Sequence, residues 1–408
     1  MLKTIAVNQV RIGMYIHELK GPWMDHPFWR TKFVLKDEMD LLKLKGSALK
    51  QVVIDTKRGL DVLPEPEVIA PSLTDKELAL LEMQSVALEE EMAQVKQTPL
   101  DAELRKAAKV IQSSRREIMS MFKDLRMGKV IEAANVMPLV EEISQSVTRN
   151  THALISLVRL KTADDYTYLH SIAVSALMTN LARELKLSDV EVKQAALAGL
   201  MHDMGKAEVP LQILNKPGSL TDNEFDVIRQ HPQSGYDLLV RANIIDPVTL
   251  DVCLHHHEKM DGSGYPEHLS GENISIYARM GAICDVYDAI TSARAYKPGW
   301  EPGIALKRMA SWTGHFDPVV LEAFVKSMGI YPIGTVVMLK SGRLAVVVRQ
   351  SADSLLTPVV KAFFSTKSLV HIPVEEIDLS RQRADEIVSN ESAVSWGIGN
   401  IEHLWATH

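Results

Sequence analysis

Hydrophobic and polar positions follow three patterns along the chain. Residues 1–70 alternate loosely between the two kinds, which is typical of strands, and 38–50 has helical spacing. From 129 to 331 the apolar positions recur every three or four residues, as on the buried face of a helix. Alternation returns over 333–378, where a turn at 340–343 separates two apolar runs and predicts a β-hairpin. The pattern predicts a mainly α protein with a small mixed α/β N-terminal domain and a short β-rich C-terminal segment.

Proline and capping signals place the boundaries between these parts. Pro64, Pro66 and Pro71 break the chain, and a capping box at Thr74 and Glu77 then starts a helix. The charged stretch that follows is either a solvated connector or a helix that contacts the helical domain or a second subunit. Further helix starts are predicted at Ser188, Thr221 and Pro318. The predicted division is a small regulatory domain over 1–70, a helical linker over 71–128, a helical domain over 129–331 and a β-rich segment with its tail over 332–408.

An aromatic insert, Trp23–Trp29, stands out in a chain that is only 6% aromatic. It is interpreted either as a surface loop packed on the small domain or as a contact for a partner or signal. Both interpretations stay open from the sequence.

Composition and charge limit the class of protein. The chain has 408 residues, of which 46% are hydrophobic and 24% charged, so it can bury real cores and is not a disordered chain. A formal net charge of -7 disfavours duplex nucleic acid as the main partner. Two cysteines cannot support a disulfide framework, the N-terminal residues lack a secretory apolar core, and no stretch approaches the roughly 20 apolar residues of a membrane span. We therefore expect a cytoplasmic protein without membrane insertion.

His170 is the first candidate functional residue. It falls on the same helix face as Val174, Leu177 and Leu181, so its imidazole points inward. A lone histidine on such a face is more often a satisfied core residue than a ligand, and its meaning depends on what lies nearby.

An apolar helix over 195–201 runs directly into His202 and Asp203. These adjacent side chains can approach one cation together, and Asp203 has two oxygens with which to bridge two ions. A bare His-Asp pair is weak evidence, but its place at the end of a buried helix strengthens it. Lys206 follows, and its compact positive charge suits a phosphate.

More histidines and carboxylates follow in the same region. His231 lies in the next helical pattern, and 255–257 is a run of three histidines, of which at most two can face one site because they project about 100° apart on a helix. The plain alternative is a surface histidine tract. A tight loop then places Tyr265 beside the tract. Asp285 and Asp288 lie in an apolar helix, where a carboxylate is costly unless it is paired or bound to a metal.

The ligand set combines imidazoles with carboxylates and no thiolate, because Cys253 and Cys284 look like buried fillers. It favours Fe or Mn over structural zinc, while Zn, Ni, Co and Mg stay open as the divalent ion. A two-metal site of this kind clamps a phosphate, neutralises its charge and makes hydroxide from bound water near neutral pH. An acidic protein needs such ions to bind a polyanionic substrate.

Several separated phrases resemble one known family. They are HDMGKAEVP, ILNKPGSLT, HHHEKMDGSGYP and CDVYDAITSARAYK, and they match in kind and order the HD-GYP subgroup of the HD phosphohydrolase superfamily over 140–330. The earlier phrases GMYIHEL and WMDHPFWR resemble the N-terminal domain that often precedes HD-GYP in bacterial proteins.

The resemblance implies an HD-type helical fold and a bacterial metal-dependent cyclic di-GMP phosphodiesterase, which opens its substrate to pGpG and often cleaves further to GMP. A water or hydroxide between two ions would attack phosphorus. By this resemblance, one ion is held by His170, His202, Asp203 and Asp285, and a second by Asp203, His231, His256 and His257. Lys206 would stabilise charge or transfer a proton near the leaving oxygen, and the family contacts its ligand where Tyr265, Arg294 and Lys297 stand.

One position departs from the family pattern. Some members carry a Glu one helical turn before the first ligating histidine and hold three ions, whereas Tyr166 stands there in this chain. We therefore expect two ions, with the second hydrolysis step less certain than the first. Glu258, Asp261 and Asp288 are expected to orient the imidazoles and the loop, and His255 to face away from the metals or to support them from behind.

Two other functions stay open. A cyclic di-GMP receptor without hydrolysis would signal through its flanking domains, and the intact ligand set argues against it. A phosphohydrolase for another nucleotide is the second alternative, and the Gly-Tyr-Pro loop with Arg294 and Lys297 favours cyclic di-GMP over it. The expected partners are the cyclic dinucleotide, a signalling protein at the N-terminal domain and a second copy of the chain in a homodimer. Family membership suggests a role in motility, biofilm or virulence control.

Overall fold

The computed structural model describes residues 2–20, 32–36, 41, 44, 51–60, 100–129, 133–159, 166–216, 218, 220–244, 246–292, 299–351, 354–381, 385–399 and 401–406. They belong to two compact units, Met1–Ala87 and Leu88–His408. The aromatic insert Trp23–Trp29, most of the helix predicted over 38–50, and the capping box at Thr74 and Glu77 lie outside the described residues.

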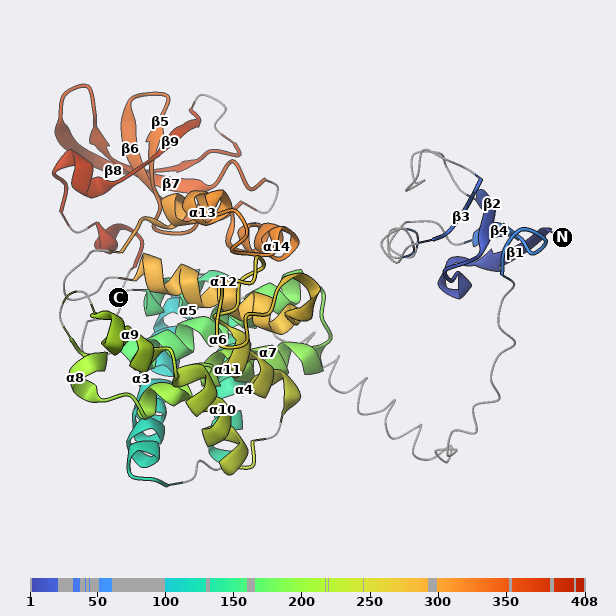
Figure 1. Ribbon diagram of the computed structural model, residues 1–408. Helices are drawn as coiled ribbons and strands as arrows, with labels where there is room; N and C mark the ends of the chain where they lie inside the picture. The colour runs from blue at the N-terminus through green and yellow to red at the C-terminus, as the bar shows by residue number, and fades with distance from the viewer. Residues whose placement is uncertain are drawn as a thin grey trace, which may run out of the picture. The chain divides into compact units, whose positions relative to one another are not determined.

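The N-terminal unit contains a four-stranded antiparallel sheet, drawn in blue in Figure 1. Its strands are β1 (Leu2–Ala6), β2 (Tyr15–Lys20), β3 (Phe33–Val34) and β4 (Gln51–Asp55), in the order β1-β4-β2-β3. A short 3₁₀ helix, η1 (Val7–Gln9), follows β1. Ile5, Ile16, Val52 and Ile54 share one buried cluster, which confirms the alternating pattern predicted for this region.

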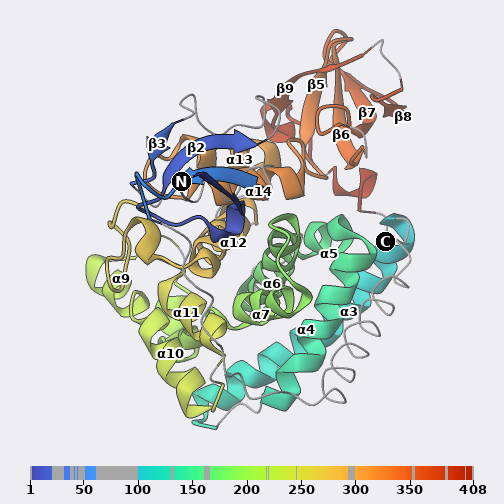
Figure 2. The same ribbon diagram turned by 90° about the vertical axis from the view of Figure 1, so that its right-hand side faces the viewer.

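The larger unit is a bundle of helices that are joined by short connections. Figure 2 shows α6 and α7 at its centre, with α3 and α4 along one side. The helices are α3 (Leu100–Arg126), α4 (Ala133–Arg149), α5 (Thr151–Val158), α6 (Tyr166–Glu184), α7 (Asp189–Met201), η4 (Met204–Ala207), α8 (Leu211–Leu214), α9 (Asp222–Ile228), α10 (His231–Arg241), α11 (Pro247–His255), η5 (Gly271–Asn273), α12 (Ile276–Thr291), α13 (Pro302–Ser311) and α14 (Pro318–Met328).

Local signals start several of these helices as predicted. The Ser188 hydroxyl accepts a hydrogen bond from the backbone amide of Glu191 in α7. The Glu191 carboxylate accepts one from the backbone amide of Ser188 in return. Thr221 and Glu224 form the same capping box at α9, and α14 begins with Pro318.

The helix α3 is part of the bundle core rather than a solvated connector. Its residues Leu104, Ile118 and Phe122 are buried in the same apolar cluster as α6 and α7. The buried carboxylate of Glu103 also accepts two hydrogen bonds from the Arg149 guanidinium of α4, at 2.9 and 2.8 Å. Of the two interpretations of this stretch, contact with the helical domain is therefore correct for the described residues.

The C-terminal strands form a five-stranded antiparallel sheet, drawn in orange to red in Figure 1. They are β5 (Val336–Leu339), β6 (Arg343–Arg349), β7 (Val359–Ser365), β8 (Val370–Asp378) and β9 (Ile387–Glu391), in the order β8-β7-β6-β5-β9, followed by η6 (Ala393–Trp396) and η7 (Glu402–Leu404). The hairpin predicted at 340–343 joins β5 to β6, and Val336 pairs with Val346. Arg159 of the helical bundle donates to the Ile333 carbonyl at 3.0 Å and covers the Trp405 ring, which ties the sheet to the bundle.

Together these features confirm the predicted fold class: a helical main body with a small N-terminal sheet and C-terminal strands. Within the described part of the chain, no helix has both the length and the apolarity needed to cross a membrane.

Replacing Glu103 with Ala tests whether α3 folds with the bundle. The Arg149 guanidinium would lose a two-pronged partner at a largely buried position, so we expect the free energy of unfolding to fall by about 2–4 kcal/mol. Chemical denaturation of the Glu103→Ala protein measures this change, with Lys106→Ala on the exposed side of α3 as the control. Equal stability of the two variants would contradict the assignment of α3 to the core.

Candidate metal centre

Five elements of the helical bundle direct histidine and aspartate side chains to one place. The helix α6 supplies one from its first turns, α7 ends at a pair, α10 begins with one, α11 ends at the histidine tract, and α12 supplies one from its middle. The structure brings all seven predicted ligands together: His170, His202, Asp203, His231, His256, His257 and Asp285. They form three overlapping trios, and within each trio the ligand atoms lie within 4.8 Å of one another.

Asp203 lies at the middle of this group and is fully buried. Its Oδ2 is 3.4 Å from His170 Nε2 and 3.3 Å from His202 Nε2. Its Oδ1 is 3.2 Å from His231 Nε2 and 3.8 Å from His256 Nε2. The two oxygens of one carboxylate therefore face two separate sets of imidazoles.

Asp285 completes the set from α12. Its Oδ1 lies 2.9 Å from His170 Nε2, and its Oδ2 lies 3.8 Å from His257 Nδ1. The α12 carboxylate thus faces the same cluster as Asp203.

Backbone carbonyls fix the orientation of three of the imidazoles. The Nδ1 atoms of His202, His231 and His256 lie 2.8, 2.7 and 2.9 Å from carbonyl oxygens three or four residues earlier in the chain. A carbonyl only accepts, so each Nδ1 carries the hydrogen and each Nε2 keeps its lone pair. These lone pairs point into the cluster, as metal ligands require.

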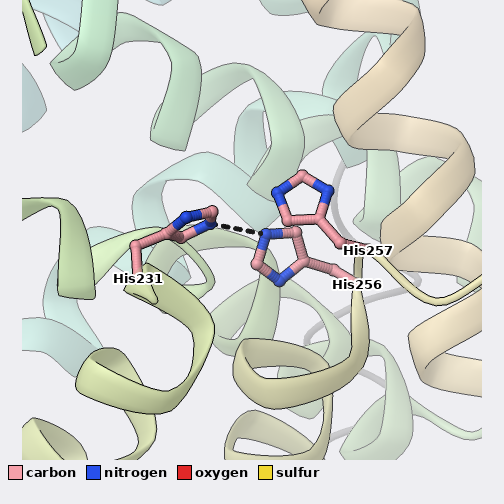
Figure 3. Close-up of side chains that lie close together, drawn as sticks. All are labelled: His231, His256 and His257. Atoms are coloured by element: carbon pink, nitrogen blue, oxygen red, sulfur yellow. Dashed lines mark hydrogen bonds between the residues drawn. The ribbon is translucent and has the colours of Figure 1, made fainter. Parts of the chain in front are cut away.

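Figure 3 shows how the rings of His231, His256 and His257 converge. The Nε2 atoms of His231 and His256 are only 3.3 Å apart, and with both lone pairs facing each other this contact needs a proton or a cation between them. Burial, reinforced by the neighbouring His257, holds the pKa of His256 well below its ordinary value, which disfavours the proton. A divalent cation fits the pair.

Two further observations support the fit of metal ions. Within the described residues, His202 Nε2 and Asp203 Oδ1 are buried polar atoms without a hydrogen-bond partner. Such atoms are costly inside a protein unless something binds them. The donor set of imidazole and carboxylate suits Fe, Mn or other borderline divalent ions.

The charge states also suit metal binding. Burial lowers the pKa of His257 to about 3, so its imidazole is neutral. Burial alone would raise the pKa of Asp203, but the charge of the adjacent Lys206 outweighs it and holds that pKa well below its usual value. Burial would likewise raise the pKa of Asp285, but the hydrogen bond with His170 keeps that pKa low. Ionised carboxylates and a neutral His257 imidazole are forms that bind metals.

Asp288 supports the cluster from behind, as the sequence predicts. Its Oδ2 lies 2.6 Å from His170 Nδ1, and its Oδ1 accepts the Ser292 hydroxyl at 3.2 Å. His170 is thereby oriented with Nε2 toward Asp203 and Asp285.

The other predicted residues fall in different places. His255 faces away from the cluster and contacts Asp251 and Glu267. Glu258 is buried and accepts the Glu267 amide, while Asp261 forms an exposed turn. Arg294 and Lys297 lie outside the described residues.

Lys206 and Tyr265 lie beside the cluster. Lys206 pairs with Asp203 through its Nζ atom. The Tyr265 ring stacks on His257 with centroids 4.8 Å apart. The sequence analysis missed Arg229, whose guanidinium carbon lies 4.8 Å from the centre of the Tyr265 ring. The available signal was its place two residues before His231.

Comparisons with known proteins agree with this geometry. An HD domain family model matches residues 136–320, and a model described as a domain of unknown function (DUF3391) matches residues 2–136. A protein of Pseudomonas aeruginosa named cyclic di-GMP phosphodiesterase PA4108 is 51% identical over 408 residues, covering 99% of this chain and 96% of that protein. The Xanthomonas campestris response regulator RpfG, also named a cyclic di-GMP phosphodiesterase, is 43% identical over 148 residues, or 36% of this chain and 39% of that one. A Vibrio cholerae 3'3'-cGAMP-specific phosphodiesterase 1 is 41% identical over 169 residues, or 41% of this chain and 39% of that one.

A helical bundle with a buried carboxylate between two sets of metal-type ligands defines the class as a metal-dependent HD-domain hydrolase. The chain belongs to the HD-GYP family of cyclic di-GMP phosphodiesterases, with a DUF3391 domain at its N-terminal end.

Replacing Asp288 with Asn tests the orientation of His170. The amide cannot accept the His170 hydrogen as strongly as the carboxylate does, so we expect divalent-metal affinity to fall about 10- to 100-fold. Titration of the metal-free protein with Mn(II) measures the change, and Asp261→Asn in the exposed turn is the control. Unchanged affinity in Asp288→Asn would show that this contact does not position the ligand.

Proposed function

We propose that this protein hydrolyses cyclic di-GMP to pGpG with two divalent metal ions. The observation that carries the proposal is the buried Asp203 carboxylate, whose two oxygens face two sets of imidazoles. The substrate follows from the family, because the relative that matches nearly the whole chain is named a cyclic di-GMP phosphodiesterase.

The proposed ligand sets divide at Asp203. His170, His202 and Asp285 join Asp203 around one ion, while His231, His256 and His257 join it around the other. Iron or manganese is the proposed metal, because the donors are imidazoles and carboxylates. The ions would neutralise phosphate charge and supply an acidified water for attack on phosphorus. Two ions are proposed rather than three, because Tyr166 offers no carboxylate.

The chain's own residues would bind and orient the substrate around these ions. Lys206 lies next to Asp203, where its charge would stabilise the leaving oxygen or its proton would pass to it. Tyr265 and Arg229 form a stacked pair beside His257 that would hold the dinucleotide. Arg294 and Lys297 are proposed phosphate contacts, because a guanidinium forks onto a phosphate and an ammonium offers a point charge.

The proposed setting of the enzyme is the cytoplasm. A signalling protein at the N-terminal domain and a second copy in a homodimer are the proposed partners. We also propose domains over 1–70, 129–331 and 332–408, with 71–128 as a helical linker whose helix α3 packs into the bundle core.

Product analysis tests the proposed function. The protein would be reloaded anaerobically with Fe(II) or Mn(II) and incubated with cyclic di-GMP and, in parallel, with 3'3'-cGAMP. We expect pGpG or GMP from cyclic di-GMP, and no product after a chelator. Cyclic di-GMP that binds but is not cleaved by protein with two bound ions would favour a receptor, and faster cleavage of 3'3'-cGAMP would assign a different substrate.

Replacing Asp203 with Ala tests the shared carboxylate. Both proposed ions lose a ligand at once, so we expect bound metal and hydrolysis to be lost together, with turnover at the uncatalysed background. Metal analysis and turnover on the same sample measure both quantities. Glu208→Gln, an exposed carboxylate after the same loop, is the control. Retained hydrolysis in Asp203→Ala would refute the shared role.

Replacing Tyr265 with Ala separates substrate binding from metal binding. The side chain stacks on a ligand without being one, so we expect KM to rise about 10-fold while metal content stays at the wild-type level. Tyr265→Phe keeps the ring and is the matched control. An equal loss of metal in Tyr265→Ala would make the residue structural.

A further inference from the structure

The last residue of α3, Arg126, reaches the loop that follows the His-Asp pair. Its Nη2 donates to the carbonyl oxygen of Lys206 at 3.1 Å, and its Nη1 donates to the carbonyl oxygen of Val209 at 3.2 Å. The two prongs of one planar guanidinium thus hold both ends of the segment that leaves η4. A lysine ammonium lacks this rigid fork, so it would hold the two carbonyls with less fixed geometry.

Close backbone packing also fixes η4 at Gly205. A Cβ built on Gly205 would lie 1.9 Å from the carbonyl oxygen of His231 and 2.5 Å from the amide nitrogen of Gly235. The η4 backbone therefore rests directly on α10, the helix that begins with His231. Both α10 and Arg126 thus restrain this short segment.

The helix that carries Arg126 is itself firmly anchored. Its neighbours Phe122 and Leu125 are buried in the core cluster of the bundle. At the far end of α3, Glu103 pairs with Arg149 of α4. A shift of the last turn of α3 would move the guanidinium and, through it, the Lys206 backbone.

We propose that Arg126 is a positioning residue that holds Lys206 against Asp203. This inference rests on the proposed function for its catalytic consequence. Arg126 lies before the HD domain match at 136–320 and inside the 2–136 match to the domain of unknown function. The helix α3, which lies within that N-terminal match, thus contacts the loop that carries Lys206.

Steady-state kinetics of full-length variants test the catalytic consequence. In Arg126→Ala, we expect kcat to fall between about 10-fold and 100-fold, as for small displacements of a catalytic group, with KM and bound metal near wild type. Arg126→Lys should recover part of the loss. Lys123→Ala removes a positive charge from the same helical turn and should match wild type. The positioning role would be overturned if kcat fell as much in Lys123→Ala as in Arg126→Ala. It would also be overturned if Arg126→Ala lost bound metal.

A double-mutant cycle shows whether the effect passes through Lys206. In a Lys206→Ala background, Arg126→Ala should cause almost no further loss of kcat, because the positioned group is gone. If the fold-losses in kcat of the two single variants multiply in the double variant, Arg126 acts independently of Lys206.

Hydrogen exchange tests the anchor independently of turnover. Amides of 203–209 should exchange faster in Arg126→Ala than in wild type or Lys123→Ala, whether or not the protein cleaves cyclic di-GMP. Unchanged exchange would overturn the anchor itself. If the metal-loaded wild-type protein does not cleave cyclic di-GMP and Arg126→Ala still exchanges faster than wild type, the anchor is supported and the proposed function is refuted.

Discussion

A buried carboxylate that serves two sets of imidazoles is the constraint on which the larger unit depends. Asp203 is fully buried, and burial alone would favour its neutral form. The charge of Lys206 keeps it ionised, and its two oxygens face different histidines. Metal ions between these groups would satisfy buried atoms that otherwise have no partner in the described part of the chain. The same feature that is costly for folding is thus the one that the proposed chemistry needs.

The helices around Asp203 are arranged so that their ends, rather than their middles, deliver most of the ligands. His202 follows the last residue of α7, His231 opens α10, and His256 follows the last residue of α11. At each of these places a nearby backbone carbonyl fixes the ring. Side chains at helix ends can converge on one point from several directions. The apolar faces of α6 and α12 then close the bundle around the cluster.

Much of this arrangement could be predicted from the sequence, because its signals are local. Helical periodicity places His170 on a buried face, and the His-Asp pair directly follows an apolar helix. Contacts between distant segments left no such signal. The charged composition of α3 allowed a solvated connector, and only the buried Glu103–Arg149 pair and the core contacts show its true place. Arg229 and Arg126 were missed for the same reason, since each acts through a residue that is distant in sequence.

The central claim is that Asp203 joins two metal ions in one site. Electron paramagnetic resonance of protein reconstituted with two equivalents of Mn(II) tests it most directly, because ions in such sites lie about 3.5–4 Å apart and their spins couple. The account predicts the spectrum of a coupled pair, which is lost in the metal-free protein and returns on reconstitution. A spectrum of isolated Mn(II) ions at full loading would contradict it.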